Sequence, residues 1–178
     1  MDYKPNLFAR RKGLIFTDKE SFCQQIRLCE KAMYSAAFSV LKNESDCADV
    51  ISEAIYRAYK KLDTLKSEAS FKPWILSIVH NTAVEEIRKS AKIIKTEEIA
   101  DYPCKGPEQG LTESISLKRA VDSLKQPYRT AVVLFYYESL SVAQIAQITG
   151  TGTATVKKRL SRARSMLKEL LKEDFNNE

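Results

Sequence analysis

The sequence has very little of what catalytic and metal-binding proteins use. It contains one histidine, His80, and four cysteines, Cys23, Cys29, Cys47 and Cys104, of which no two form a CxxC pair. No familiar zinc spacing can therefore be assembled. A glycine-rich phosphate loop is also missing, and no nucleophile stands beside a plausible base. We therefore expect a protein that is not an enzyme, with reduced structural thiols and no cofactor, metal or small-molecule substrate.

Long apolar runs and strand-like alternation are also absent. The first residues are charged and lack the apolar stretch of about 7–15 residues that a secretory signal needs. No segment approaches the roughly 18 apolar residues of a transmembrane helix, which predicts a cytoplasmic protein. Apolar residues instead recur at helical spacing, so the predicted fold class is all-α. The net charge of +6 fits a polyanionic partner without requiring one.

Three stretches with this helical spacing form the first half of the chain. Thr17 and Glu20 fit a capping box that starts the first helix, because each side chain can accept a hydrogen bond from the other's backbone N–H. Ser45 or Asp46 is predicted to open the second helix, and the third follows a polar loop. Together they predict one compact domain over residues 17–94.

Two segments lack a sustained apolar period. Residues 1–16 form a basic N-terminal arm, and residues 95–111 form a linker in which prolines and glycines gather. Helical spacing resumes after the linker and predicts a second domain over residues 112–178. The predicted architecture is two small helical domains joined by a flexible linker.

The second domain ends in a helix-turn-helix pattern. Ser141 is predicted to cap a short helix, the turn Thr149–Gly152 breaks it, and Thr153 is predicted to cap a longer helix. From Thr153 to Lys168 this longer helix carries basic residues and no acidic one. That pattern is typical of a recognition helix that enters the major groove of DNA. The alternative is a hairpin that only packs, with its basic face solvated.

Three stretches in this order carry a family resemblance. They are ADVISEAIYRAYKKLDTL from Ala48, FKPWILSIVHNTAVEEIRK from Phe71 and SLSVAQIAQITGTGTATVKKRLSRARSML from Ser139. The chain resembles the bacterial extracytoplasmic-function sigma factors, the small two-domain initiation subunits of RNA polymerase. The resemblance implies binding to the clamp helices of the largest catalytic subunit of core RNA polymerase, recognition of two promoter DNA elements and help with melting. It also implies control by an anti-sigma factor, of a kind that is often membrane-bound.

The resemblance assigns residues to each of these contacts. The polymerase-binding positions are Asp49, Ser52 and Glu53. The positions that contact the downstream promoter element are Asn81, Arg88 and His80. The positions that read the upstream element are Thr153, Thr155, Lys157, Lys158 and Arg162.

Other interpretations stay open for the chain and for single residues. The chain could be an autonomous helix-turn-helix regulator that acts as a dimer, or a helical adaptor that binds only proteins. Asp49 and Glu53 also fit a solvated helix face. The helical spacing of Phe71 and Trp74 favours a place in the core over base stacking. Arg159 lies near the apolar stripe, where packing or an internal ion pair competes with DNA contact.

Overall fold

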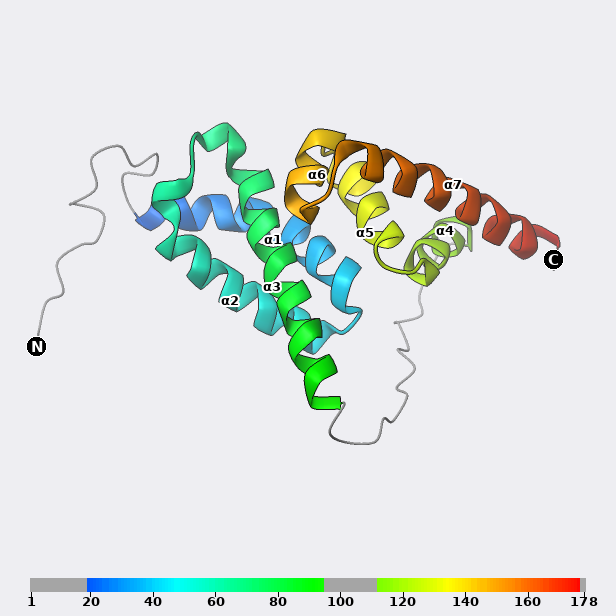
Figure 1. The fold of residues 1–178 in the computed structure, drawn as a ribbon, viewed down its shortest axis with the longest axis horizontal. Coiled ribbons are helices and arrows are strands. Elements are labelled where there is room, and N and C mark those ends of the chain that lie inside the picture. The colour runs from blue at the N-terminus through cyan, green and yellow to red at the C-terminus, as the bar shows by residue number, and fades with distance from the viewer. Residues whose placement is uncertain (1–18, 95–111, 177–178) are drawn as a thin grey trace, which may run out of the picture.

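The computed structural model describes residues 19–94 and 112–176 (Figure 1). The first range holds three α-helices, α1 (Lys19–Leu41), α2 (Glu44–Lys60) and α3 (Phe71–Ile94), with 3-10 turns over Leu62–Thr64 and Glu68–Ser70 between the last two. The second holds four, α4 (Thr112–Ser123), α5 (Tyr128–Val132), α6 (Val142–Thr149) and α7 (Thr153–Asn176), with a π-helical turn over Val133–Tyr137. No strand occurs within these two ranges, so the predicted all-α class is confirmed. The predicted arm, the Thr17 cap and the linker lie outside the described residues.

The first three helices pack on one another through the stripes that the sequence predicted. Met33 of α1 and Ile75 of α3 are completely buried between them. Ala54, Ala58 and Ala83 are completely buried as well, and their small side chains allow the helices to approach closely. Each large apolar side chain buried in this way contributes about 1.5–3 kcal/mol.

The aromatic side chains at the start of α3 belong to this core. Phe71 is almost completely buried, and its ring centroid lies 6.2 Å from that of Phe22 in an edge-on arrangement. Trp74 is half-buried, and its Nε1–H donates a hydrogen bond to Thr64 Oγ1 at 3.1 Å. The prediction that Phe71 and Trp74 serve the core is therefore confirmed.

The described cysteines are free thiols. Cys29 and Cys47 are buried, whereas Cys23 is only half-buried. Burial, followed by the charges of Asp46 and Glu44, raises the pKa of Cys47 to about 11. Since the thiolate is the reactive form of cysteine, Cys47 stays inert at neutral pH.

Two helix starts differ from the predicted caps. Asn43 caps α2, because its Oδ1 accepts hydrogen bonds from the backbone N–H groups of Ser45 at 2.9 Å and Asp46 at 3.4 Å. The prediction that Ser45 or Asp46 opens this helix is therefore wrong. Thr153 is already the first residue of α7, and the carbonyl of Gly152 accepts the first helical hydrogen bond. Gly152, and not Thr153, holds the N-cap position.

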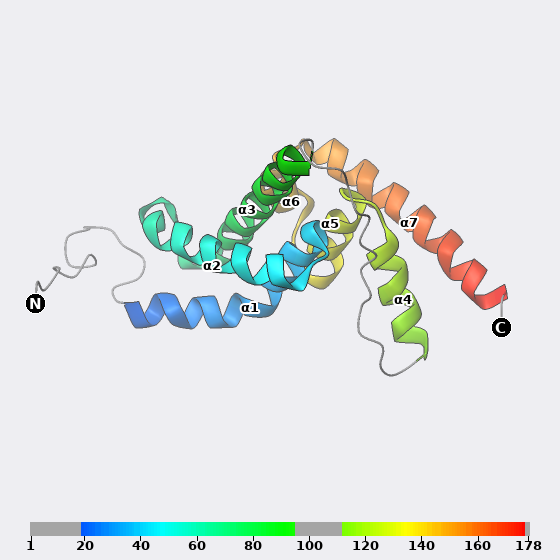
Figure 2. The same ribbon diagram turned by 90° about the horizontal axis from the view of Figure 1, so that it is seen from below.

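The two described ranges pack directly on each other. In Figures 1 and 2, α5 and α6 lie beside α1 and α3, while α7 extends away from them. The apolar side chains of Leu134, Ile145 and Ile148 join the same continuous core as α1 to α3. Glu138, only 8% exposed, forms an ion pair with Lys72 of α3 at 3.0 Å. The two halves of the chain thus share a core and polar contacts.

Replacing Ser141 by alanine is expected to lower the free energy of unfolding by about 0.5–2 kcal/mol. The Ser141 hydroxyl accepts from the Gln144 backbone N–H at 3.2 Å, and the Gln144 side chain accepts from the Ser141 N–H at 2.9 Å. Urea denaturation measures the effect. The exposed Ser161→Ala serves as the matched control and should change stability by less than about 0.5 kcal/mol. Equal stability of the two variants would contradict the cap.

Candidate nucleic-acid interface

The helix-turn-helix places a basic face in solvent. Gly150 ends α6 with a φ of 62°, in the left-handed region that glycine adopts without strain. α7 then buries Val156 and Leu160 against the core. The positions predicted to read the upstream element are all exposed, namely Thr153, Thr155, Lys157, Lys158 and Arg162. Thr155, Lys158 and Arg162 lie on the face opposite the buried stripe, whereas Lys157 lies at its edge and Thr153 begins the helix.

The positions predicted to bind polymerase lie exposed on α2. The Ser52 hydroxyl donates to the Ala48 carbonyl at 2.9 Å, so it is occupied by its own helix. Glu53 accepts from Arg57 Nε at 2.7 Å, and Arg57 Nη1 reaches Glu85 of α3 at 2.6 Å. These bonds, first to Glu85 and then to Glu53, raise the pKa of Arg57. Arg57 therefore links α2 to α3, and Glu53 helps to hold its side chain in place.

The three positions predicted to contact the downstream element lie on α3 and line a cleft between the two halves of the chain. Asn81 and Arg88 are exposed, whereas His80 is only 6% exposed. His80 can therefore meet DNA only if the two halves separate. Sequence reasoning did not anticipate this burial, because the residues that cover α3 come from a part of the chain more than 40 residues away.

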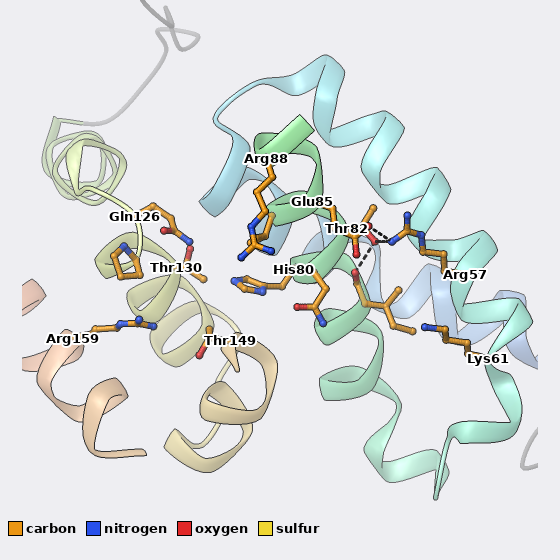
Figure 3. A pocket seen from close by; sticks show the side chains of 14 residues that line it. Arg57, Lys61, His80, Thr82, Glu85, Arg88, Gln126, Thr130, Thr149 and Arg159 are labelled. Carbon is orange, nitrogen blue, oxygen red and sulfur yellow. Dashed lines mark hydrogen bonds and ion pairs between the residues drawn. The ribbon is translucent and has the colours of Figure 1, made fainter. Parts of the chain in front are cut away.

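The cleft has a volume of about 480 Å³ and receives side chains from both halves (Figure 3). Arg57 comes from α2, Lys61 directly follows that helix, and Arg88 comes from α3. Gln126 precedes α5, and Arg159 comes from α7. In Figure 3 the His80 imidazole points into the middle of this space. Arg159 therefore faces the cleft, and within the described ranges it has no ion pair.

Burial is the main cause of a lowered pKa at His80. The positive charge of Arg159 lowers the pKa further, while the neighbouring Asn81 side chain acts in the opposite direction. The groups around the imidazole are Asn81 and Arg88 of α3, Gln126 before α5 and Arg159 of α7, with the Arg57–Glu85 ion pair behind them. The folded arrangement thus favours the neutral imidazole.

This pKa shift predicts that the folded chain loses stability as the pH falls below about 6.5, the pKa of an unperturbed histidine. In that range the unfolded chain binds a proton at His80 and the folded chain does not, so acid favours unfolding. Urea denaturation at pH 7.5 and pH 5.5 measures the loss, and His80→Gln should reduce it. An equal loss in the variant would show that other groups cause it.

Two further features bear on the interface. No helix in the described ranges is long and apolar enough to cross a membrane. The described residues also contain no cluster of three side chains able to hold a metal ion.

Two family models match the chain in succession. The sigma-70 region 2 model matches residues 26–93, and the sigma-70 region 4 model matches residues 114–167. The RNA polymerase sigma factor SigV of Bacillus subtilis (strain 168) is 35% identical over 145 residues, which cover 80% of this chain and 87% of that protein. The ECF RNA polymerase sigma factor SigW of the same strain is 27% identical over 171 residues, covering 88% and 91%.

Solved structures agree with these matches. The sigma factor RpoE of Bartonella quintana, solved in complex with the anti-sigma factor NepR, is similar with a TM-score of 0.75 and 26% identity, over 86% of this chain and 98% of that one. CnrH, solved with the cytosolic domain of CnrY, has a TM-score of 0.63 at 23% identity, over 88% and 91%. At that identity the likeness concerns the fold alone.

Proposed function

We propose that this chain, which belongs to the extracytoplasmic-function group of RNA polymerase sigma factors, binds core RNA polymerase and directs the enzyme to promoters. The observation that carries the proposal is the match to region 2 over residues 26–93 followed by region 4 over residues 114–167. The exposed basic face of α7 supports it independently. The chain contributes recognition and melting, and the polymerase performs nucleotidyl transfer.

Three surfaces have separate tasks in this proposal. Asp49, Ser52 and Glu53 of α2 bind the clamp helices of the largest catalytic subunit. Asn81, Arg88 and His80 of α3 contact the downstream element. Thr153, Thr155, Lys157, Lys158 and Arg162 of α7 read the upstream element in the major groove. Two modest contacts on one polymerase reinforce each other through effective concentration, so neither surface needs to bind tightly alone.

Contact between His80 of α3 and promoter DNA requires the two halves to move apart. His80 is only 6% exposed, and the cleft in which it lies is closed on its far side by residues before α5 and on α6 and α7, whereas Asn81 and Arg88 are exposed. The described arrangement is therefore a closed state with regard to His80. Docking on polymerase supplies the free energy to open it.

An anti-sigma factor is the proposed regulator. RpoE was solved in complex with the anti-sigma factor NepR, and CnrH, which is similar in fold, was solved in complex with the cytosolic domain of CnrY. A partner that holds the two halves of this chain together keeps α3 covered. The relative amounts of polymerase and regulator then determine whether the chain is active.

Reconstituted transcription tests the function. The chain is mixed with bacterial core RNA polymerase and a pool of genomic promoters from its own source, and the transcript starts are sequenced. We expect starts that need the chain and share a pair of upstream motifs. No chain-dependent start, with folded chain and active polymerase, would instead favour a dimeric regulator or a protein-binding adaptor.

Asp49→Ala is expected to weaken binding to core polymerase by about tenfold, which corresponds to about 1.4 kcal/mol. Its carboxylate is exposed on the proposed polymerase-binding face of α2. Biolayer interferometry with immobilised core polymerase measures the affinity. Glu30→Ala, an equally exposed carboxylate on α1, is the matched control and should bind like the parent chain. If both variants bind alike, α2 does not use Asp49 for this contact.

A further inference from the structure

The cleft between the two halves carries an excess of positive charge. Arg57, Lys61, Arg88 and Arg159 line it, and Glu85 is the one acidic side chain among its lining residues. Glu85 is already paired with Arg57 at 2.6 Å. Within the described ranges neither Arg88 nor Arg159 has an acidic group within ion-pair distance. The uncompensated charge therefore includes one arginine from each half.

Among the described residues of the closed arrangement, Arg88 and Arg159 have no counter-charge, and a buried nitrogen of His80 has no hydrogen-bond partner. Arg88 extends from α3 and Arg159 from α7 into the same space, on either side of His80 (Figure 3). Arg88 and Arg159 thus bring two like charges to one cleft, and like charges repel. His80 is more than nine-tenths buried, and its Nδ1 has no hydrogen-bond partner. A buried nitrogen without a partner also costs free energy.

We propose that this cleft is a binding site for a small phosphate-bearing anion, held between Arg88 and Arg159 and contacted by His80. Guanidinium groups bind phosphate oxygens in pairs, and a tetrahedral phosphate accepts hydrogen bonds from several directions at once. The Gln126 amide, on the far wall, supplies a further donor. The hydroxyl of Thr149 does not, because it already donates to the Ile145 carbonyl at 2.8 Å. A volume of about 480 Å³ lies within the usual range for small-ligand sites.

Phosphate groups could reach these residues from two sources. A DNA strand that contacts α3 in an opened chain meets Arg88 without Arg159. A free phosphate compound in the closed cleft meets both arginines. The proposal concerns the free compound, which bridges the two halves and stabilises the closed state. The bound compound would compete with the downstream promoter element for Arg88, and this effect rests on the proposed function. Binding of the compound to the isolated chain does not rest on it.

Titration of the full chain with pyrophosphate, without polymerase or DNA, tests the site. His80 is the chain's one histidine, so its imidazole NMR signals report the cleft without ambiguity. We expect a saturable shift of these signals, and a rise in the thermal midpoint of about 3 °C at ten times the dissociation constant. Sodium chloride of equal ionic strength should cause neither.

Variants separate the bridging site from binding to one helix. Arg88→Ala and Arg159→Ala should each weaken pyrophosphate binding by about tenfold or more, since each removes one arm of the bridge. Arg164→Ala, an exposed arginine elsewhere on α7, is the control and should bind normally. Circular dichroism verifies that each variant is folded. Absence of saturable binding, or binding that is unaffected by Arg159→Ala, would overturn the proposal, while the transcription experiment decides the sigma function separately.

Discussion

Replacing Arg129 by alanine is expected to destabilise the chain by about 2–4 kcal/mol and to loosen the contact between its halves. Arg129 is only 5% exposed. Its Nε donates to the Ser39 carbonyl at 2.8 Å, and its Nη1 donates to the Leu124 carbonyl at 2.6 Å. Ser39 lies in the last turn of α1, where carbonyls lack helical partners and a positive charge is favourable. One side chain thus joins the end of α1 to the segment after α4.

Urea denaturation measures the loss of stability, and small-angle scattering measures the increase in the radius of gyration. Burial lowers the pKa of Arg129, which shows that the buried charge is itself costly. Arg129→Met, which keeps the volume and removes the charge, should therefore lose less stability than Arg129→Ala. Arg119→Ala, an exposed arginine on α4, controls for loss of charge alone. Our interpretation fails if Arg129→Ala is as stable as Arg119→Ala.

The helices and the exposed face of α7 could be predicted because they depend on local spacing. Residues on a helix advance by about 100° each, so the apolar stripe of Val156 and Leu160 also fixes which residues point outward. Lys158 and Arg162 are indeed exposed. Cap positions were harder to predict, because Asn43, Ser45 and Asp46 are all good capping residues. Only the backbone geometry of Asn43, with φ −131° and ψ 127°, decides among them.

The closed cleft and the contact between the halves could not be predicted from spacing. Arg129 and Ser39 are 90 residues apart, and neither lies in a pattern that points to the other. His80 was predicted to contact DNA, which implies an exposed side chain, but α6 packs against α3. Periodicity identifies which side of a helix is covered by its nearest neighbours. It does not identify a second surface that is covered by a distant part of the chain.

The double variant Lys158→Ala/Arg162→Ala is expected to reduce binding to the upstream promoter element by at least about tenfold. Each side chain that makes a specific base contact contributes about 1–3 kcal/mol, and each one that neutralises a phosphate contributes to the salt dependence. The two residues are four apart on the exposed face of α7, so they reach the same stretch of the groove. Fluorescence anisotropy with a duplex that carries the element, repeated over a range of salt concentrations, measures both effects.

The closed state makes this test possible on the free chain. The outer face of α7 is exposed while His80 of α3 is buried, so duplex binding through Lys158 and Arg162 does not require the halves to separate. A matched control, Lys118→Ala/Arg119→Ala, removes two exposed positive charges from α4 and should leave the affinity for the element nearly unchanged. A loss confined to the α7 variant, with normal polymerase binding, assigns upstream recognition to this helix. If chain-dependent transcription also survives the α7 variant, promoter recognition resides elsewhere, and a protein-binding role for α7 gains support.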